Sequence, residues 1–553
     1  MAVVATKLPA STKTKTRIIV LDDIADAGLE KLNAAVGIEY DIRPGLKGEA
    51  LREALRDYDG AVCRSGVTIT AESLAGNRRL RAIVRAGVGT DNIDKAAATR
   101  LGIIVMNTPD GNTVSTAEHT MALLLGLSRN VAPAHASLLA GKWDRKKFQG
   151  SQVSGKTLGV VGLGRIGLEV AKRAKSFGMN VIGYDPFMSS ERAAELGITK
   201  VETVDEMLPQ LDYLTVHTPL TNETKGLIGP AQVQRLKKGA RLINCARGGI
   251  YDLVALEAGL KSGHLGGIAL DVYEDEPCLD SPLFAMPNTL CTPHLGASTD
   301  EAQVEVAVEA VELLVNYLTT GEIRSAVNAF SLDPQTLKLM RGYLDVAHRL
   351  GTLMGQWHGG ALESCDLEVQ GEIAAKDTRI LVSAFCAGLI GDKIEGANIV
   401  NAEVLCRERG IEIIHKSTLD HGAFNSVISA TVKGEGRSLQ AAGTLFGKNM
   451  PRLVRLGEYR TEAYLDGILL IFTHTDVPGI IGYVGQVLAD EKVNIAQMAV
   501  GREGAAGGPA IGVLNLDQVA TESALKRVYE HAAIQSAKMI VLPPVGQLPN
   551  WLS

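Results

Sequence analysis

The sequence predicts a multidomain α/β protein in which one domain is inserted in another and two smaller α+β modules follow. Three observations support this prediction. First, 553 residues at about 150 per domain suggest three or four domains, each able to bury a core. Second, short apolar strands alternate with helical stretches over the first half of the chain, which is typical of parallel sheets covered by helices. Third, two long helices bracket the segment with the strongest motifs, as expected if the chain crosses between two domains twice.

Composition excludes several classes of function. The formal charge of −6 argues against a nucleic-acid-binding protein, which usually carries a basic excess. No segment reaches the roughly 18 apolar residues of a membrane-spanning helix, so a membrane partner is not expected. The seven cysteines form no C-x-x-C pair, which predicts reduced cytoplasmic thiols and neither a disulfide framework nor a metal site. Residues 1–16 lack acidic side chains and are expected to form a flexible tail, with a transit-peptide remnant as the alternative.

The first folded element is expected to be a strand at residues 17–21, followed by a helix at 27–35. Strands at 60–63 and 80–84 continue the alternation. Two S-x-x-E capping boxes, at 115–118 and 298–301, predict the starts of the two long helices. Apolar residues at helical spacing in the second helix are interpreted as core or interface packing: Val304, Val308, Val311, Val315 and Leu318.

A glycine-rich turn between a strand and a helix is the strongest local motif. The strand 157–161 runs into G-L-G-R-I-G at 162–167, and a helix is expected at 168–175. In this motif Gly162 makes the tight turn, Gly164 lets the backbone approach a pyrophosphate, and Gly167 allows close helix–strand packing.

A second strand, 180–184, ends in Asp185, about 20 residues after the glycines, where an acid is expected to bind the ribose hydroxyls. A carboxylate repels a 2′-phosphate, so the motif predicts NAD and not NADP. The alternative is a glycine turn beside a solvent-facing aspartate.

Three candidate catalytic residues come directly after apolar strands: His217, Arg247 and His294. In an open α/β sheet the carboxyl ends of the strands line the ligand crevice. Oxidation of an alcohol by hydride transfer needs a base for the hydroxyl proton and a cation that holds the substrate. His294 is the favoured base, with a structural histidine as the alternative. The residues alone leave the choice of an accompanying acid open among Glu274, Asp275 and Glu276.

The last third of the chain has a different pattern. Residues 331–465 mix helix and strand patterns without a catalytic constellation. Three arginines in this stretch are interpreted as a solvated basic face, with an anion site as the alternative: Arg452, Arg455 and Arg460. Residues 466–545 predict the order βαββαβ, with strands at 468–473, from 493, at 509–516 and at 538–542, and helices from 479 and at 521–534. This order is typical of a ferredoxin-like split βαβ sandwich.

Several stretches match one family. The sequence resembles the D-isomer-specific 2-hydroxyacid dehydrogenases, and a W-x-R-K-K-F loop at 143–148 narrows the match to the phosphoglycerate dehydrogenases. The other matching stretches are the glycine motif, R-A-G-V-G-T-D-N-I-D at 85–94, H-T-P-L at 217–220, N-C-A-R-G-G at 244–249, A-L-D-V-Y at 269–273 and T-P-H-L-G-A-S-T at 292–299.

The resemblance implies a Rossmann-type NAD-binding domain (112–295) inserted in a flavodoxin-like substrate-binding domain (17–111 and 296–330). An α+β intervening domain (331–465) and a ferredoxin-like ACT domain (466–545) are expected to follow.

The resemblance also implies the site residues. Arg247 is expected to bind the substrate carboxylate, His294 to accept the hydroxyl proton, and Glu276 to orient the imidazole. Expected NAD contacts are Gly162, Gly164, Arg165, Ile166, Gly167, Asp185, Thr218, Cys245, Ala246, Asp271, Gly296 and Ala297; for Asp271 a strand-end turn is the alternative. Expected substrate contacts are Arg64, Ser65, Arg85, Gly87, Val88 and Gly89, with Arg145 and Lys146 reaching across a dimer interface; surface ion pairs are the alternative for the basic residues.

The last module resembles an ACT domain, a regulatory unit that binds L-serine between subunits in related dehydrogenases. The matching positions are His474, Asp476 and Asn494. Asp476 departs from the asparagine of some relatives, although an acid there can hold the ammonium group of serine. A purely structural, dimerising ACT domain is the alternative.

The resemblance therefore implies a homo-oligomer, a dimer or tetramer, that oxidises 3-phospho-D-glycerate with NAD⁺ to 3-phosphonooxypyruvate, the entry step of L-serine synthesis. Two alternatives come from the same scaffold. One is a dehydrogenase of an unphosphorylated 2-hydroxy acid, and the other is a non-enzymatic corepressor that senses NAD.

Overall fold

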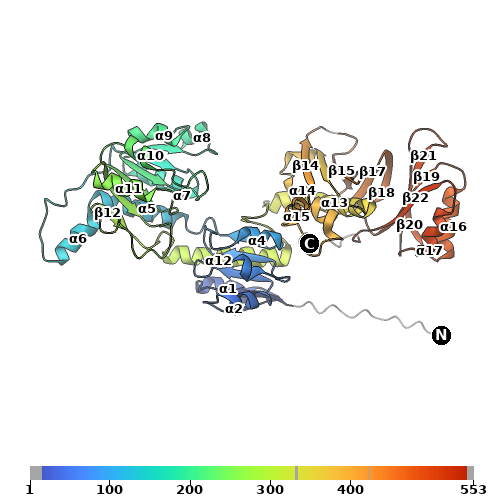
Figure 1. The fold of residues 1–553 in the computed structure, drawn as a ribbon, viewed down its shortest axis with the longest axis horizontal. Helices are drawn as coiled ribbons and strands as arrows, with labels where there is room; N and C mark the ends of the chain where they lie inside the picture. Colours follow the sequence, from blue (N-terminus) through green and yellow to red (C-terminus); the bar gives the residue numbers. More distant parts are fainter. Residues whose placement is uncertain (1–14, 331–333, 421, 545–553) are drawn as a thin grey trace. The chain divides into compact units, whose positions relative to one another are not determined.

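The computed structural model describes residues 15–330, 334–420 and 422–544 (Figure 1). The chain divides into two compact units, of which one contains residues 24–28 and 108–309 and the other contains the rest. Most of the expected tail, together with residues 331–333 of the expected intervening domain and residue 545 of the expected ACT domain, lies outside the described residues. Strand β1 (Thr16–Val20) begins at Thr16, the last residue of the expected tail, and the Lys15 Nζ donates to Glu39 Oε1 at 2.6 Å.

A five-stranded parallel sheet forms the first domain, in the order β2-β1-β3-β4-β5. This is the flavodoxin-like strand order, which confirms the predicted fold. The strands are β1 (Thr16–Val20), β2 (Ile38–Ile42), β3 (Gly60–Cys63), β4 (Ala82–Arg85) and β5 (Ile104–Asn107), and the helices are α1 (Asp26–Ala34), α2 (Gly48–Leu55), α3 (Ala71–Leu74) and α4 (Lys95–Arg100). The sequence analysis missed β2 and β5. Strand β2 is a half-exposed edge strand without an apolar run, and β5 is only four residues long.

A seven-stranded parallel sheet forms the inserted domain, in the order β12-β11-β10-β9-β6-β7-β8. Read from β8 to β11, this is the Rossmann order, so that prediction is also confirmed. The strands are β6 (Thr157–Val161), β7 (Asn180–Tyr184), β8 (Thr199–Lys200), β9 (Tyr213–Val216), β10 (Ala240–Asn244), β11 (Leu265–Leu270) and β12 (Thr289–Cys291). The helices are α5 (Thr113–Ser128), α6 (Val131–Leu139), α7 (Arg165–Ser176), α8 (Ser190–Glu195), α9 (Val204–Met207), α10 (Pro230–Arg235) and α11 (Leu253–Lys261), with the 3₁₀ turn η1 (Leu208–Gln210).

Both predicted capping boxes were wrong. Helix α5 begins at Thr113, so Ser115 lies inside its first turn, where the hydroxyl donates to Gly296 O at 2.8 Å. Helix α12 (Asp300–Thr320) begins one residue later than the second box requires, because the Thr299 hydroxyl accepts the N–H of Ala302. The predicted apolar stripe on α12 is only partly buried: Val311 and Leu318 are in the core, but Val304 is 42% exposed.

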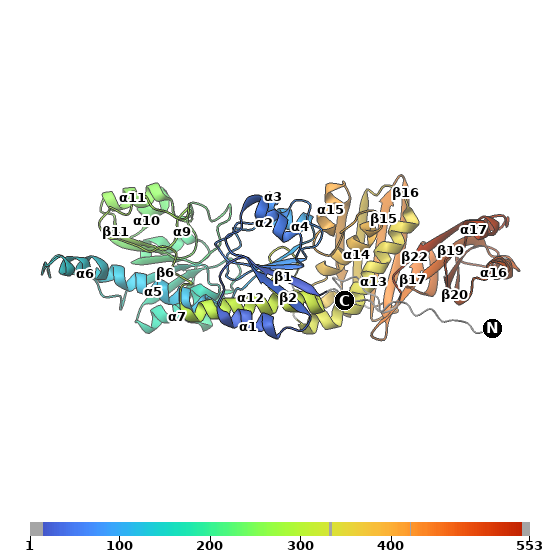
Figure 2. The ribbon, with the colours of Figure 1, turned by 90° about the horizontal axis from the view of Figure 1, so that it is seen from below.

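The intervening segment forms a six-stranded mixed sheet in the order β14-β13-β15-β16-β17-β18, with α13 and α14 packed side by side on it (Figures 1 and 2). Its strands are β13 (Ser364–Gly371), β14 (Glu412–Thr418), β15 (Ser426–Gly434), β16 (Arg437–Phe446), β17 (Met450–Leu456) and β18 (Tyr459–Tyr464). Its helices are α13 (Pro334–His358), α14 (Arg379–Gly391) and α15 (Ala402–Glu408), with the 3₁₀ turn η2 (Glu372–Ala375).

The last module confirms the βαββαβ order. Its elements are β19 (Ile468–Thr475), α16 (Ile480–Asp490), β20 (Ile495–Arg502), β21 (Pro509–Leu516), α17 (Glu522–Tyr529) and β22 (Ile534–Val541). They form an antiparallel sheet in the order β20-β21-β19-β22. This is the arrangement of a ferredoxin-like sandwich.

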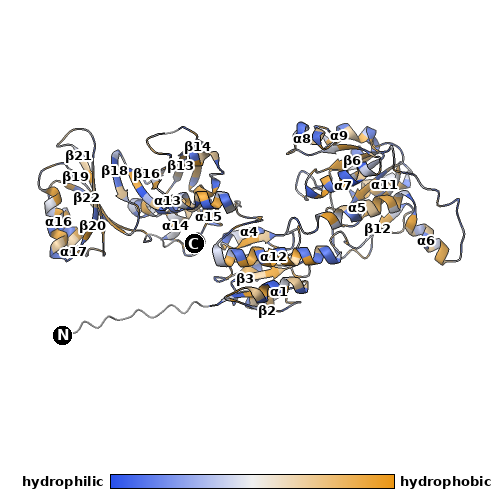
Figure 3. Ribbon diagram, turned by 180° about the vertical axis from the view of Figure 1, so that it is seen from behind, coloured by the Kyte–Doolittle hydropathy of each residue, from blue (hydrophilic) through white to orange (hydrophobic). Residues whose placement is uncertain are grey.

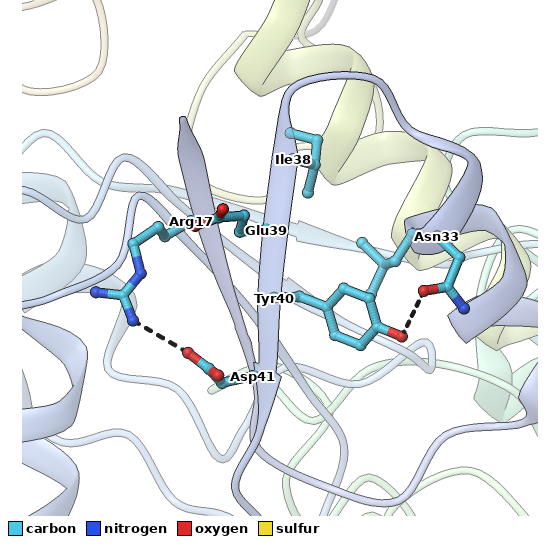
Figure 4. Close-up of a pocket in the computed structure, with 7 residues that line it drawn as sticks. Arg17, Asn33, Ile38, Glu39, Tyr40 and Asp41 are labelled. Atoms are coloured by element: carbon cyan, nitrogen blue, oxygen red, sulfur yellow. Dashed lines mark hydrogen bonds and ion pairs between the residues drawn. The ribbon is translucent and has the colours of Figure 1, made fainter. Parts of the chain in front are cut away.

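A pocket at the open edge of the first sheet lies beside β2 (Figure 4). Its polar side chains pair with one another: Arg17 Nη2 donates to Asp41 Oδ2 at 3.1 Å, and the Tyr40 hydroxyl donates to Asn33 Oδ1 at 3.0 Å. None of the predicted site residues lines this pocket. The predicted catalytic residues lie instead at the carboxyl ends of the strands of the inserted domain. Within the described ranges, no helix is long and apolar enough to cross a membrane.

Candidate active site

The glycine turn joins β6 to α7, and two of its glycines lie so close to neighbouring backbone atoms that a side chain would not fit. Gly162 has a φ of +89°, and a Cβ there would lie 2.6 Å from the carbonyl oxygen of His217. A Cβ on Gly167 would lie 1.9 Å from the carbonyl oxygen of Gly162, so only glycine fits. Gly164, by contrast, has nothing of the chain within 4 Å of its missing Cβ, which leaves the first turn of α7 open. An open helix N-terminus suits the pyrophosphate of a dinucleotide.

Asp185 follows β7 and fastens this turn. Its Oδ2 accepts the N–H of Leu163 at 2.9 Å, and its Oδ1 accepts the N–H of Phe187 at 2.8 Å. Each carboxylate oxygen has a second lone pair, so the group can also accept ribose hydroxyls. The residues present therefore fit NAD.

Glu276 and His294, 18 positions apart in the chain, meet beyond the ends of β11 and β12. The Nδ1 of His294 lies 2.6 Å from Glu276 Oε2, and Glu276 Oε1 accepts the N–H of Tyr273 at 3.0 Å. Burial raises the pKa of Glu276, but the hydrogen bonds from His294 and Tyr273 outweigh it, so the net pKa is lowered. The side chain of His294 is 49% exposed, so the rest of its ring is open to a small molecule.

The loops that carry this pair are tied together by Tyr273. Its hydroxyl donates to the carbonyl oxygen of Thr292 at 3.0 Å, which joins the segment after β11 to the segment after β12. Its ring packs edge-on against Phe284, with centroids 5.6 Å apart. The sequence analysis did not assign a role to Tyr273, although it lies three residues before the predicted acid.

Arg247 lies at the carboxyl end of β10, the strand next to β11. Its Nη1 donates to the carbonyl oxygen of Ala246 at 2.7 Å. Asn244, which is 2% exposed, holds this turn: its Nδ2 donates to Arg247 O at 2.8 Å and its Oδ1 accepts the N–H of Ala246 at 2.9 Å. The guanidinium is therefore presented from a fastened turn at the same sheet edge as Glu276 and His294. Asn244 is a second residue whose role the sequence analysis missed.

His217, the other histidine at a strand end, is unsuited to acid–base chemistry. Burial lowers its pKa to about 4, so the imidazole is neutral near neutral pH. Its Nε2 lies 3.1 Å from Thr215 Oγ1, and its carbonyl oxygen packs against Gly162. His217 therefore supports the glycine turn, and of the two candidates His294 is the better base.

The first domain places its candidate substrate contacts at the ends of β3 and β4. The N–H of Arg64 donates to Asp22 Oδ2 at 2.5 Å, and its Nη1 donates to Asp23 O at 3.1 Å. Gly87 has a φ of +147°, and a Cβ there would lie 2.9 Å from Arg85 Nη1. The Asn107 Nδ2 fixes the next residue by donating to Val88 O at 2.5 Å. Arg145 and Lys146 belong to the inserted domain and lie on the exposed segment after α6.

In the last module the three predicted effector residues have partners of their own. Asp476 Oδ2 lies 2.8 Å from Arg502 Nη2, and Asn494 Nδ2 donates to Asp517 Oδ2 at 2.7 Å. His474 is 1% exposed and its ring centroid lies 5.3 Å from that of Phe472.

Comparisons with known proteins identify family models and relatives that match the chain. A model of the NAD-binding domain of D-isomer-specific 2-hydroxyacid dehydrogenases matches residues 121–296, and a model of the D-3-phosphoglycerate dehydrogenase intervening domain matches residues 339–457. D-3-Phosphoglycerate dehydrogenase of Methanocaldococcus jannaschii is 38% identical over 527 residues, which are 95% of this chain and 100% of that protein. The chloroplastic D-3-phosphoglycerate dehydrogenase 2 of Arabidopsis thaliana is 36% identical, over 95% of this chain and 86% of that protein.

The chain belongs to the D-3-phosphoglycerate dehydrogenase family.

Solved structures agree with this assignment for the first half of the chain. A glyoxylate reductase from Paecilomyes thermophila has a TM-score of 0.53 and 30% identity, and covers 57% of this chain and 98% of its own. An NAD-dependent formate dehydrogenase from Staphylococcus aureus in complex with NAD has a TM-score of 0.52 and 31% identity, over 57% of this chain and 100% of its own. This member of the D-3-phosphoglycerate dehydrogenase family is accordingly an NAD-dependent oxidoreductase, which argues against a non-enzymatic corepressor.

Proposed function

We propose that the chain oxidises 3-phospho-D-glycerate with NAD⁺ to 3-phosphonooxypyruvate, the first step of L-serine biosynthesis. The observation that carries the proposal is the 2.6 Å contact between His294 and Glu276 at the strand ends of the NAD-binding domain. Full-length relatives with the corresponding name support the choice of substrate.

His294 is the base in this proposal. Its Nδ1–H donates to the Glu276 carboxylate, which leaves a lone pair on Nε2 for the proton of the substrate hydroxyl. The same carboxylate stabilises the imidazolium that results, and its lowered pKa keeps it ionised near neutral pH. When bound, NAD⁺ accepts the hydride from C2 of the substrate. Arg247 offers a planar pair of N–H donors to the substrate carboxylate and the C2 oxygen.

The NAD contacts are proposed on the glycine turn and along the same sheet edge. The turn would hold the pyrophosphate, and Asp185 the adenosine ribose. The other proposed contacts are those expected from the family: Arg165, Ile166, Thr218, Cys245, Ala246, Asp271, Gly296 and Ala297.

The substrate phosphate and carboxylate are proposed to bind at the ends of β3 and β4, where Arg64 and Arg85 flank the backbone of 87–89. Ser65, Arg145 and Lys146 complete the proposed set. The test is steady-state turnover with 3-phospho-D-glycerate and with D-glycerate. We expect a kcat/KM at least about 100-fold higher for the phosphorylated substrate, since each charge-assisted hydrogen bond contributes roughly 1.5–3 kcal/mol. Equal values would favour a dehydrogenase of an unphosphorylated 2-hydroxy acid.

A homo-oligomer is proposed from helix α6 and the segment after it. None of the side chains of α6 is buried, and the helix is largely apolar (Figure 3). Leu139 is 76% exposed and Trp143 is 78% exposed. A contiguous exposed apolar surface is typical of a protein–protein interface. A second copy of this chain is the proposed partner, and sedimentation would give its stoichiometry.

We propose that the domains have the boundaries expected from the sequence. We also propose that L-serine regulates the enzyme at the ACT-like module. The proposed location of the protein is the cytoplasm. All seven cysteines are free, which suits a reducing compartment. Asp476 directly follows β19 and Asn494 directly precedes β20.

A further inference from the structure

One face of helix α5 is fastened to the segment that carries His294. Ser115 Oγ and Thr116 Oγ1 donate to the carbonyl oxygen of Gly296 at 2.8 and 3.2 Å. One turn further along, the Nε2 of His119 lies 3.1 Å from Asp271 Oδ1 and 3.1 Å from Thr292 Oγ1. Three residues of one helix thus contact the residues on both sides of His294.

Asp271 is the centre of these contacts. It is fully buried, and its Oδ1 accepts the Thr292 hydroxyl at 2.6 Å and the N–H of Leu295 at 2.7 Å, while its Oδ2 accepts the N–H of Gly296 at 2.9 Å. Burial raises the pKa of Asp271, but the hydrogen bonds from His119, Thr292 and Leu295 outweigh it and leave the pKa below its usual value. The carboxylate is therefore charged, and a buried carboxylate with this many donors is a rigid anchor.

The backbone that Asp271 anchors is unusual. His294 has a φ of +57°, in the left-handed region that a histidine seldom adopts. Its own N–H donates to Thr292 O at 3.1 Å, and the two N–H groups that follow it are those held by Asp271. The imidazole is therefore oriented twice, through its ring by Glu276 and through its backbone by Asp271.

We propose that His119 is a positioning residue for the reaction: its Nε2–H donates to Asp271 and thereby keeps the His294 backbone in its left-handed turn. This inference rests on the proposed role of His294 as the base. A shift of about 1 Å in a catalytic group can cost about 100-fold in rate, so loosening the anchor acts on kcat. The glycine turn proposed to hold the pyrophosphate lies on other residues, so the affinity for NAD should change less than kcat, although Asp271 and Gly296 are themselves proposed NAD contacts.

The experiment compares His119→Met, which removes the donor at similar length, with His119→Gln, whose amide N–H can replace it. His264→Met is the matched control, since the Nε2 of His264 contacts Val233 O at 2.9 Å in the same domain, away from the candidate site. Measurements are kcat and KM for 3-phospho-D-glycerate, the Kd for NAD⁺ by fluorescence titration, and the thermal unfolding midpoint. Wild-type turnover is measured first, so a failure of the proposed function is recognised before the variants are compared.

His119→Met is expected to lower kcat about 10- to 100-fold, with a smaller change in the Kd for NAD⁺. His119→Gln should recover most of that loss, and His264→Met should keep wild-type kcat whatever its melting temperature. Equal losses in the Met and Gln variants, a kcat within twofold of wild type in both, or a loss confined to NAD⁺ affinity would each overturn the proposal. If His119→Met does not fold, Thr292→Val removes the neighbouring donor to the same carboxylate oxygen and is judged by the same outcomes.

Discussion

Two fully buried charges, Asp271 beside the candidate active site and Arg349 on α13, perform the same task in regions that differ in every other respect. Asp271 accepts backbone N–H groups on the far side of His294. Arg349 donates to the carbonyl oxygens of Leu465, Pro543 and Pro544, which precede and follow the ACT-like module, and it pairs with Asp345 at 2.6 Å. One charge holds the loop that carries the proposed base His294, and the other holds both ends of a module.

The difference lies in the groups around each charge. The imidazole of His119 contacts Asp271, and the loop that Asp271 holds carries His294, whose side chain is half exposed. The guanidinium of Arg349 donates to the Asp345 carboxylate and otherwise to backbone carbonyl oxygens. A buried charge can therefore hold either an exposed loop that is open to a small molecule or a fixed junction at the ends of a module, depending on the exposure of the groups that it anchors.

The largest effect is expected from substitution of the proposed base, His294. His294→Ala should lower turnover by about 10²- to 10⁴-fold, the usual contribution of a positioned acid–base group, while NAD⁺ binding stays close to wild type. Steady-state kinetics and NAD⁺ titration give the two numbers. Near-normal turnover of this variant would refute the assigned base.

Substitution of Arg349 should lower the stability of the protein and change its turnover much less. Arg349→Met leaves Asp345 buried without its partner and should lower the free energy of unfolding by about 3–5 kcal/mol, as measured by urea denaturation. The double variant Arg349→Met/Asp345→Leu removes both charges and should regain part of this loss. If the single and double variants are equally unstable, the unpaired charge of Asp345 is not the cause of the instability. If Arg349→Met is as stable as wild type, Arg349 does not stabilise the ends of the module.

Cofactor specificity tests the proposed role of Asp185 beside the glycine turn. Asp185→Ala should weaken NAD⁺ binding about 10-fold or more through lost ribose hydrogen bonds, and NADP⁺ binding far less, because the carboxylate no longer repels a 2′-phosphate. Binding titrations with both dinucleotides decide the matter. Equal losses for the two would mean that Asp185 acts only by holding the N–H groups of Leu163 and Phe187.

Acid should affect the two regions in opposite directions. The pKa of Asp271 is below its ordinary 3.8, so its contribution to stability is present above pH 3.8 and is lost as the pH falls through the lowered value. Burial raises the pKa of Asp345, more than Arg349 lowers it, so its contribution is present below pH 3.8 and is lost as the pH rises through the raised value.

Urea denaturation of wild type, Asp271→Asn and Asp345→Asn between pH 3 and pH 7 separates the two contributions. Asp271→Asn should flatten the loss of stability at the acid end, and Asp345→Asn should flatten the loss above pH 3.8. Parallel curves for all three proteins would contradict both assignments.

The smallest effect is expected in the ACT-like module. Asn494→Ala removes the donor to Asp517 and should weaken serine inhibition without changing the uninhibited rate. Inhibition curves for wild type and variant give the comparison. A loss of basal rate would instead assign Asn494 a structural role, and unchanged inhibition would remove it from the serine site.

Sequence patterns predicted most of the strands that are both apolar and buried, although the buried strand β5 was missed. Strands β3, β6, β7 and β21 have the predicted bounds. The edge strand β2 was missed because its side chains are half exposed and carry no apolar run. The helix starts at Thr113 and Asp300 were misplaced because local S-x-x-E patterns cannot show that Ser115 bonds across the domain to Gly296.

The sequence by itself determined the family, the dinucleotide turn and the residues at the strand ends, because short-range motifs and the period of apolar residues are local properties of a chain. The tertiary structure decided which of these residues act together. It chose Glu276 over Glu274 and Asp275 as the partner of His294, and it brought His119 from a distant helix onto Asp271. The Glu276–His294 contact joins residues 18 positions apart, whereas His119 and Asp271 are 152 positions apart and only the packing of α5 against the ends of β11 and β12 brings them within hydrogen-bonding distance.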